Sequence, residues 1–141
     1  MPVKYSYEPI VAYDNHELIV KEPGVVVVQT IVQNQSLNPY GNAHGGFLFT
    51  LCDSVAGGVA ISLGVDAVTS TANINYLKAA RLDDKLTITG TCVHNGRKTK
   101  VVSVDVFNQR GEMICQGSFT MFVINLDVNH VDGAFYMPPI K

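Results

Sequence analysis

The sequence predicts a single α+β domain over residues 1–141, in which an antiparallel sheet of five or six strands wraps around one long helix. Three observations predict it. The chain has 141 residues, of which 47% are hydrophobic, and this suits one domain with a substantial core. Several segments show strand-like apolar patterns and are joined by short turns. A single long helical segment lies between the first strand and the later ones.

The first strand is predicted at residues 24–33, where the run GVVVVQTIVQ is rich in β-branched side chains. Residues 17–20 form a further short strand or extend this one. The sheet therefore has five or six strands.

The long helix is predicted over residues 46–63 and is followed by Gly64, in a position that favours left-handed backbone. An apolar stripe at helical spacing is formed by Leu48, Leu51, Val55, Val59 and Ser62. The opposite face holds the only carboxylate of the helix among apolar and small residues, namely Phe49, Asp53, Ala56, Gly57 and Ala60. Because small residues flank Asp53, we expect another group to approach this face closely.

Four more strands are predicted at residues 68–77, 85–94, 98–108 and 112–125. The last three form an antiparallel meander, because residues 95–97 and 109–111 are short connections that contain Asn or Gly and tolerate positive φ. A strand, a loop, a long helix and four antiparallel strands are the outline of the hotdog fold. Residues 126–141 are predicted to be irregular.

Composition argues against several classes of protein. The net charge of −2 and the pI near 6.0 provide no basic surface for nucleic-acid phosphates. The first residues lack the pattern of a signal peptide and no stretch of eighteen apolar residues occurs, so a cytoplasmic protein without a membrane partner is expected. The three cysteines Cys52, Cys92 and Cys115 show no metal or disulfide spacing and are expected to be reduced and mostly buried.

A polar, glycine-rich loop at residues 38–46 runs directly into the N-terminus of the predicted helix. Backbone N–H groups there lack intrahelical partners and stabilise negative charge. The amide of Gly45 or Gly46 would therefore suit the oxyanion that forms on a thioester carbonyl. The simpler interpretation is that these glycines form a flexible turn.

Asp53 is a candidate base or nucleophile, but it lies eight residues beyond Gly45. A helix rises 1.5 Å per residue, which separates the two by about 12 Å. One carbonyl cannot contact both groups of one chain. If both act on one thioester, Asp53 must come from a second copy across a two-fold axis. The hypothesis predicts a homodimer with two shared sites and leaves open whether dimers pair into tetramers.

The motif residues together resemble the PaaI-type hotdog thioesterases. They are Asn38, Gly41, His44-Gly45-Gly46 and Asp53, followed by Val68-Thr69, Asn73 to Leu77, Gly96 to Thr99 and Gln116 to Thr120. The resemblance spans about residues 24–124. A lone HGG is a weak signal. HGG followed in order by the acid, by the strand motif of residues 73–77 and by the hairpin motif of residues 96–99 is fairly specific.

The resemblance implies hydrolysis of an acyl-CoA to free acid and CoA. It implies that Gly45 donates the oxyanion-hole N–H and that Asp53 acts as nucleophile or general base. It also implies that Asn38 and His44 help to position the substrate. Thr69 stands where the family often has a residue that orients the attacking water, with Ser70 and Thr71 as alternatives.

The resemblance also implies that exposed basic residues meet the CoA phosphates. The candidates are Arg97, Lys98 and Lys100, with Lys78 and Arg81 behind them. No cofactor is expected, because CoA is part of the substrate, and no metal site is expected, because the histidines lack ligand spacing.

Two other functions compete with the hydrolase. The first is an acyl-CoA-binding hotdog protein, in which Asp53 would be only a polar contact. The second is a hotdog dehydratase, which needs a catalytic histidine and would cast His44 in that role. The pair Gly57-Gly58 and the N-terminal extension with Tyr5, Tyr7 and Tyr13 depart from the family pattern and leave the acyl group undetermined.

Overall fold

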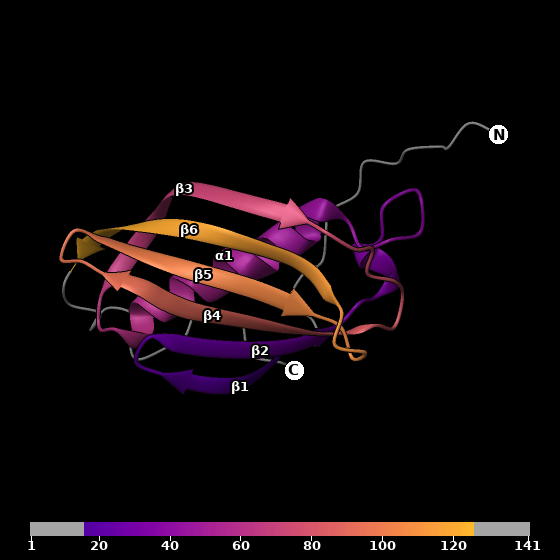
Figure 1. Ribbon diagram of the computed structural model, residues 1–141, viewed down its shortest axis with the longest axis horizontal. Coiled ribbons are helices and arrows are strands. Elements are labelled where there is room, and N and C mark those ends of the chain that lie inside the picture. The colour runs from indigo at the N-terminus through magenta and orange to yellow at the C-terminus, as the bar shows by residue number, and fades with distance from the viewer. Residues whose placement is uncertain (1–15, 126–141) are drawn as a thin grey trace.

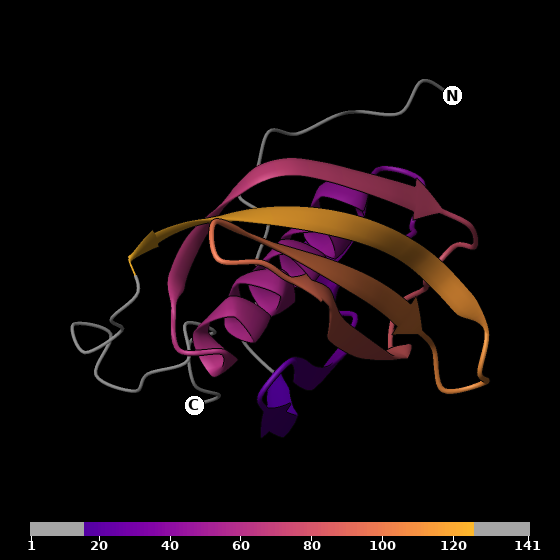
Figure 2. The ribbon, with the colours of Figure 1, turned by 60° about the vertical axis from the view of Figure 1, so that its left-hand side comes forward.

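The computed structural model describes residues 16–125, which form one six-stranded antiparallel sheet curved around a single helix (Figures 1 and 2). In chain order the elements are β1 (Glu17–Glu22), β2 (Val25–Ile31), a 3-10 turn η1 (Asn34–Ser36), α1 (Gly45–Ser62), β3 (Asp66–Tyr76), β4 (Lys85–Asn95), β5 (Thr99–Phe107) and β6 (Met113–Asn125). The predicted arrangement of one long helix against an antiparallel sheet is confirmed. The N-terminal extension and residues 126–141 lie outside the described residues.

The strand order is β1-β2-β4-β5-β6-β3, so the predicted meander of β4, β5 and β6 is confirmed. The strand that follows the helix, β3, pairs with β6 and lies at the edge of the sheet (Figure 1). Its residues 68–73 are exposed. This edge therefore presents unpaired backbone N–H and C=O groups that another strand can join.

The core lies between α1 and the concave face of the sheet, where alternate residues of β2, β4 and β5 point toward the helix. The fit is close at β4, because a Cβ added to Gly90 would lie 2.6 Å from a methyl carbon of Val55. Gly64 has a φ of +84°, as its predicted place after the helix requires. All three cysteines are free, with Cys52 and Cys115 buried, as predicted.

The second face of the helix is divided between buried and partly exposed residues. Ala56 and Ala60 are fully buried in the core, whereas Asp53 and Gly57 are partly exposed. The sheet curves over the helix (Figure 2), so small residues at the margin of the stripe are enclosed as well. The partly exposed stripe includes Phe49, Thr50, Asp53, Ser54, Gly57 and Ile61.

The helix α1 has the length and apolar composition that would suffice to cross a membrane. Nine of its residues are buried in the domain. Its hydrophobicity is therefore accounted for by its place in the core, where an apolar helix is expected.

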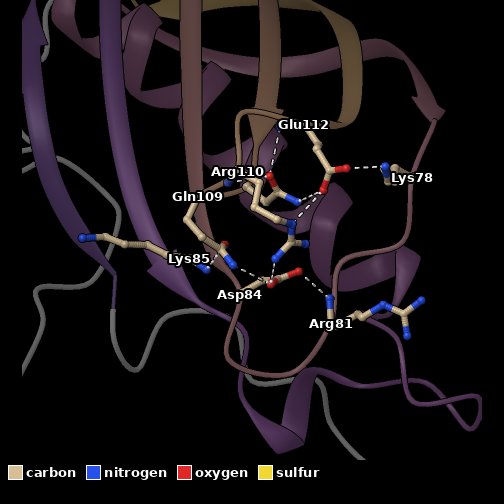
Figure 3. A network of polar contacts seen from close by, with 8 residues as sticks. Lys78, Arg81, Asp84, Lys85, Gln109, Arg110 and Glu112 are labelled. Carbon is tan, nitrogen blue, oxygen red and sulfur yellow. Dashed lines mark hydrogen bonds and ion pairs between the residues drawn. The ribbon is translucent and has the colours of Figure 1, made fainter.

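A network of polar contacts ties the β3–β4 connection to the β5–β6 hairpin (Figure 3). Glu112 forms an ion pair with Lys78 and accepts hydrogen bonds from Arg110 Nε (2.9 Å) and Asn108 Nδ2 (2.8 Å). The ion pair with Lys78, together with these two hydrogen bonds, lowers the pKa of Glu112 to about 2. Lys78 lies in the connection just after β3, so the pair fixes the chain where the edge strand ends.

The same network includes the buried carboxylate of Asp84. It accepts hydrogen bonds from the Gln109 side chain and the Arg81 amide, both at 2.9 Å, and forms an ion pair with Arg110 at 3.4 Å. Burial acts to raise the pKa of Asp84, but these donors outweigh it and the pKa is lowered. Two loops that are distant in sequence are thus held by two ionised carboxylates.

The contacts of Glu112 predict acid sensitivity. Because its pKa in the fold lies below the ordinary value of 4.5, the ionised carboxylate stabilises the fold above about pH 4.5, and this contribution is lost as the pH falls toward 2. The melting temperature of Glu112→Gln should lie below that of the wild type at pH 7, with the gap closing between about pH 5 and pH 2. Thermal unfolding over this range is the measurement. A gap that does not change with pH would contradict the assignment.

Candidate active site

The loop that leads into α1 is built around the side chain of Asn38. Its Oδ1 accepts hydrogen bonds from the backbone N–H groups of Tyr40 (2.9 Å) and Asn42 (3.1 Å), and Gly41 between them has a φ of +82°. Within residues 16–125 the amide nitrogen of the same side chain donates no hydrogen bond, so it can donate to a ligand. The side-chain oxygen of Asn38 therefore stabilises the loop, and its side-chain NH2 group is available to a ligand.

His44 caps the helix. It has extended backbone with φ −65° and ψ 136°, and its Nδ1 accepts a hydrogen bond of 2.8 Å from the Gly46 N–H. Because Nδ1 is the acceptor, the neutral ring carries its hydrogen on Nε2 and can donate from there. This bond uses the Gly46 amide, which leaves Gly45 as the glycine with an open N–H at the helix start.

Tyr76 meets the first residue of the helix from β3. Its hydroxyl donates a hydrogen bond of 2.8 Å to the Gly45 carbonyl, and its ring lies 3.4 Å from where a Cβ of Gly45 would stand. Burial raises the pKa of Tyr76, so the hydroxyl keeps its hydrogen for this bond. A cavity of about 300 Å³, the Gly45 cavity, opens here and is lined by Asn42, Ala43, Gly45, Leu48, Tyr76, Leu77, Lys78 and Ala79.

Tyr76 was given no role in the sequence analysis, although it belongs to the β3 motif Asn73 to Leu77. Nothing in the alternation of a strand predicts contact with a glycine thirty-one residues away. The only available signal was the motif itself, Asn73 to Leu77.

Asp53 lies two helical turns beyond Gly45 and contacts the opposite end of β3. The Thr69 hydroxyl donates a hydrogen bond of 2.6 Å to Asp53 Oδ1. The hydroxyl oxygen of Thr69 also lies 3.5 Å from the sulfur of Met121. A larger cavity of about 650 Å³, the Asp53 cavity, opens here. Its lining consists of Asp53, Ser54, Gly57, Gly58, Ile61, Asp66, Ala67, Val68, Thr69, Met121 and Ile124.

The structure distinguishes Thr69 from its two neighbours. The register of β3 against β6 shifts between Thr69 and Thr71, and such a bulge redirects side chains. Ser70 instead donates its hydroxyl to the Thr120 carbonyl at 3.1 Å, and Thr71 is exposed. Of the three candidates, only Thr69 is hydrogen bonded to the carboxylate of Asp53.

The two groups with catalytic potential thus open into different cavities of the same chain. The Gly45 cavity and the Asp53 cavity share no lining residue. Each holds half of the chemistry, since one offers a hydrogen-bond donor for an oxyanion and the other a carboxylate.

The basic residues divide into two groups. Arg97 and Lys98 are exposed in the β4–β5 hairpin, as expected. Lys100 was expected to be exposed with them, but it is only 7% exposed and donates a hydrogen bond of 2.6 Å to Asn95 Oδ1. The alternation of β5 explains this correction, because Lys100 shares its face with Val102, which points to the core. Within the described part of the chain no cluster of potential metal ligands is present.

Comparison with known proteins finds similarity to thioesterases. A model of the thioesterase superfamily matches residues 40–115. The chain is similar to acyl-coenzyme A thioesterase PaaI of Escherichia coli K12, with 33% identity over 98 residues that cover 70% of each chain.

Solved structures are similar as well. A hypothetical thioesterase protein of Streptococcus pneumoniae TIGR4, with coenzyme A, is 54% identical with a TM-score of 0.85, over 87% of this chain and 99% of that one. Two mutants of the Streptococcus protein carry alanine in place of a threonine or of an aspartate. Both are 55% identical to this chain, cover 86% and 85% of it and 99% of their own chains, and have TM-scores of 0.83 and 0.84.

Proposed function

The chain belongs to the thioesterase superfamily, and from this premise we propose that it hydrolyses acyl-CoA thioesters to free acid and CoA at a site shared by two copies of the chain. The observation that carries the proposal is the separation of Gly45 and Asp53 into two cavities. The reacting carbonyl needs the N–H donor within roughly 3 Å of its oxygen and the carboxylate, or the water that it activates, within roughly 3 Å of its carbon. A second copy brings the missing half to each cavity.

The edge strand β3 offers a way to bring the halves together. Its Tyr76 end touches Gly45 and its Thr69 end touches Asp53. If β3 pairs antiparallel with β3 of a second copy, the Thr69 end of one strand lies beside the Tyr76 end of the other. The exposed residues 68–73 supply the strand edge for this pairing.

The midpoints of the two segments that carry these residues lie close together, which is compatible with a two-fold axis at this place. The midpoint between Gly45 and Asp53 on α1 is Phe49, and the midpoint between Thr69 and Tyr76 on β3 lies next to Ala72. The ring of Phe49 packs on that of Phe119 with centroids 5.5 Å apart, and Phe119 pairs with Ala72 across β6 and β3. A single two-fold axis that relates the two copies can therefore run close to both midpoints, as a shared site requires.

The chemistry follows from this arrangement. The thioester oxygen accepts a hydrogen bond from the Gly45 N–H of one copy, which stabilises the negative charge that develops on it. In one route Asp53 of the other copy removes a proton from a water that attacks the carbonyl carbon, and the C–S bond breaks to release CoA, whose thiolate takes up a proton. In the other route Asp53 attacks the carbon itself, CoA leaves, and a water then hydrolyses the acyl–Asp53 anhydride to the free acid and regenerates the carboxylate. Both roles of Asp53 are compatible with this site. His44 fixes the helix start, and the free amide nitrogen of Asn38 is available to position the substrate.

Thr69 acts on Asp53 in this scheme. Its hydroxyl hydrogen is donated to Oδ1, which orients the carboxylate, while its lone pairs can accept a hydrogen bond from the attacking water. The aspartate and the threonine replaced in the Streptococcus protein are sixteen residues apart in its sequence, the same separation as between Asp53 and Thr69 here. This correspondence supports the pairing of the two residues in one function.

For the CoA phosphates we propose Arg97 and Lys98, which are exposed. Lys100 is not included because it is buried and bonded to Asn95. Lys78 is held by Glu112 and would have to leave that ion pair to meet a phosphate. A cytoplasmic location and the pairing of dimers into tetramers remain predictions of the sequence.

The test is thiol release from a panel of acyl-CoAs of different chain length, with phenylacetyl-CoA included for aromatic acyl groups. The proposal predicts steady turnover with at least one member, at a rate proportional to protein concentration. Tight binding of acyl-CoA without thiol release would favour the binding-protein alternative and contradict the proposal.

A further inference from the structure

The Asp53 cavity extends well beyond the carboxylate. Along α1 its lining continues from Asp53 through Gly57 to Ile61, that is, by one turn and then a second turn of the helix. The distance from Asp53 to Ile61 along the helix axis is about 12 Å. The remaining walls are mostly apolar or small and include Ala67, Met121 and Ile124, with Ser54, Asp66 and Thr69 as polar members. On the proposed function, this is a wall along which an acyl chain can extend from the reacting carbonyl.

Gly57 stands halfway along this wall and is not required by packing. A Cβ placed on it would meet no atom within 4 Å, whereas one on Gly90 would collide with Val55. Its φ does not lie in the positive range that favours glycine. Glycine in a helix interior lowers helix stability relative to alanine. The space beside Gly57 therefore has no structural explanation within its own chain.

Close contact between two helices does not explain Gly57 either. In the proposed dimer the two copies of α1 cross near Phe49. Two antiparallel helices that place Gly45 opposite Asp53 then place Gly57 beyond the N-terminal end of the partner helix. The empty space thus belongs to the cavity and not to the helix crossing.

We propose that Gly57 determines the length of acyl chain that the enzyme accepts, because its missing side chain leaves the Asp53 cavity continuous from Asp53 to Ile61. The inference rests on the proposed function. A zigzag chain of C–C bonds advances roughly 1.25 Å per carbon. The wall from Asp53 to Ile61 then accommodates roughly nine carbons, and a large side chain at position 57 would stop the chain after about five.

The experiment compares wild type with Gly57→Ala, Gly57→Val and Gly57→Leu on acetyl-, butyryl-, hexanoyl-, octanoyl- and decanoyl-CoA. Butyryl-CoA should keep its kcat/KM within about threefold in all variants, since its chain ends before position 57. Octanoyl-CoA should lose roughly 50-fold in kcat/KM in Gly57→Leu, because about three carbons beyond position 57 lose their burial, with smaller losses for valine and alanine. The melting temperatures should be unchanged or higher, because each variant removes a helix glycine.

Two matched variants complete the design. Ile61→Ala enlarges the far end of the cavity and should shift the preferred chain length upward. Val93→Leu enlarges an exposed side chain on β4 that lines neither cavity and should leave the whole profile unchanged. Size-exclusion chromatography shows whether each variant keeps the assembly of the wild type.

The outcomes separate the two hypotheses. If the wild type is active and Gly57→Leu shows the same chain-length profile, the inference about Gly57 is overturned and the proposed function stands. An equal loss over all chain lengths in the three variants would also overturn it, since the space would then serve assembly or folding. If no acyl-CoA is hydrolysed, stabilisation of the wild type and Gly57→Leu by the same ligands tests the pocket alone. A shift toward shorter ligands would support it, and an absent shift would overturn it.

Discussion

Replacing Asp53 by asparagine is expected to lower kcat for acyl-CoA hydrolysis by roughly 10³-fold or more, because an amide can neither attack the thioester nor take a proton from water. The side chain keeps its size, and Thr69 can still donate its hydroxyl hydrogen to the amide oxygen. The fold and the assembly should therefore persist. KM should change little, since Asp53 acts on the reacting atoms and does not hold the CoA.

The matched control is Asp83→Asn. Asp83 is an exposed carboxylate with a φ of +68°, a conformation that asparagine also adopts, and it lines neither cavity. The kcat of this variant should equal that of the wild type. Rates for Asp53→Asn within about threefold of the wild type, with unchanged melting temperature, would remove Asp53 from the mechanism.

Replacing Gly45 by proline is the second change with a large expected effect. It removes the N–H that would stabilise the oxyanion, and loss of one such donor typically lowers kcat by about 10²- to 10³-fold. The helix should tolerate the change, because proline is favoured at the first helical position. His44 already has the extended backbone that proline requires of the residue before it. The measurement is kcat, together with the helical signal in circular dichroism.

Gly45→Ala distinguishes the effect of losing the N–H donor from the effect of adding a side chain. Alanine keeps the N–H, and its Cβ would make ordinary contact with the Tyr76 ring at 3.4 Å. The loss of kcat should therefore be at least tenfold smaller than with proline. Equal losses in the two variants would mean that crowding against Tyr76, and not the lost donor, reduces the activity.

Local sequence signals were sufficient for the elements of the fold. The strand that ends at Asn95 and the one that begins at Thr99 are separated by Gly96 and charged residues, so the hairpin could be predicted from turn chemistry alone. Gly64 marked the end of α1 for the same reason. Pairing partners were not accessible in this way, because the place of β3 beside β6 depends on contacts between distant segments.

Burial was the feature that local signals predicted least well. Ala56 and Ala60 were expected on the face of Asp53, and Lys100 was expected in solvent. The two alanines are buried because the sheet curves around the helix and encloses residues at its margins, and Lys100 is buried because it lies on the core-facing side of β5. The curvature of a sheet depends on every strand together, so it is not visible in the periodicity of one element.

The candidate site was predictable in its residues and not in its contacts. The spacing of Gly45 and Asp53 predicts that one chain holds only half of each site, and in the structure the two residues line separate cavities. The bond from Tyr76 to Gly45 joins segments that no local pattern connects. The contact of Thr69 with Asp53 depends on a bulge in β3, which a single sequence does not reveal.

Complementation between inactive chains tests the shared site most directly. In a dimer of Gly45→Pro with Asp53→Asn, one site combines both defects and the other combines both intact groups. An equal mixture that exchanges freely forms half mixed dimers, so about one quarter of the wild-type activity should return. Mixed dimers, confirmed by mass spectrometry, that show no recovery would contradict a site shared between two chains.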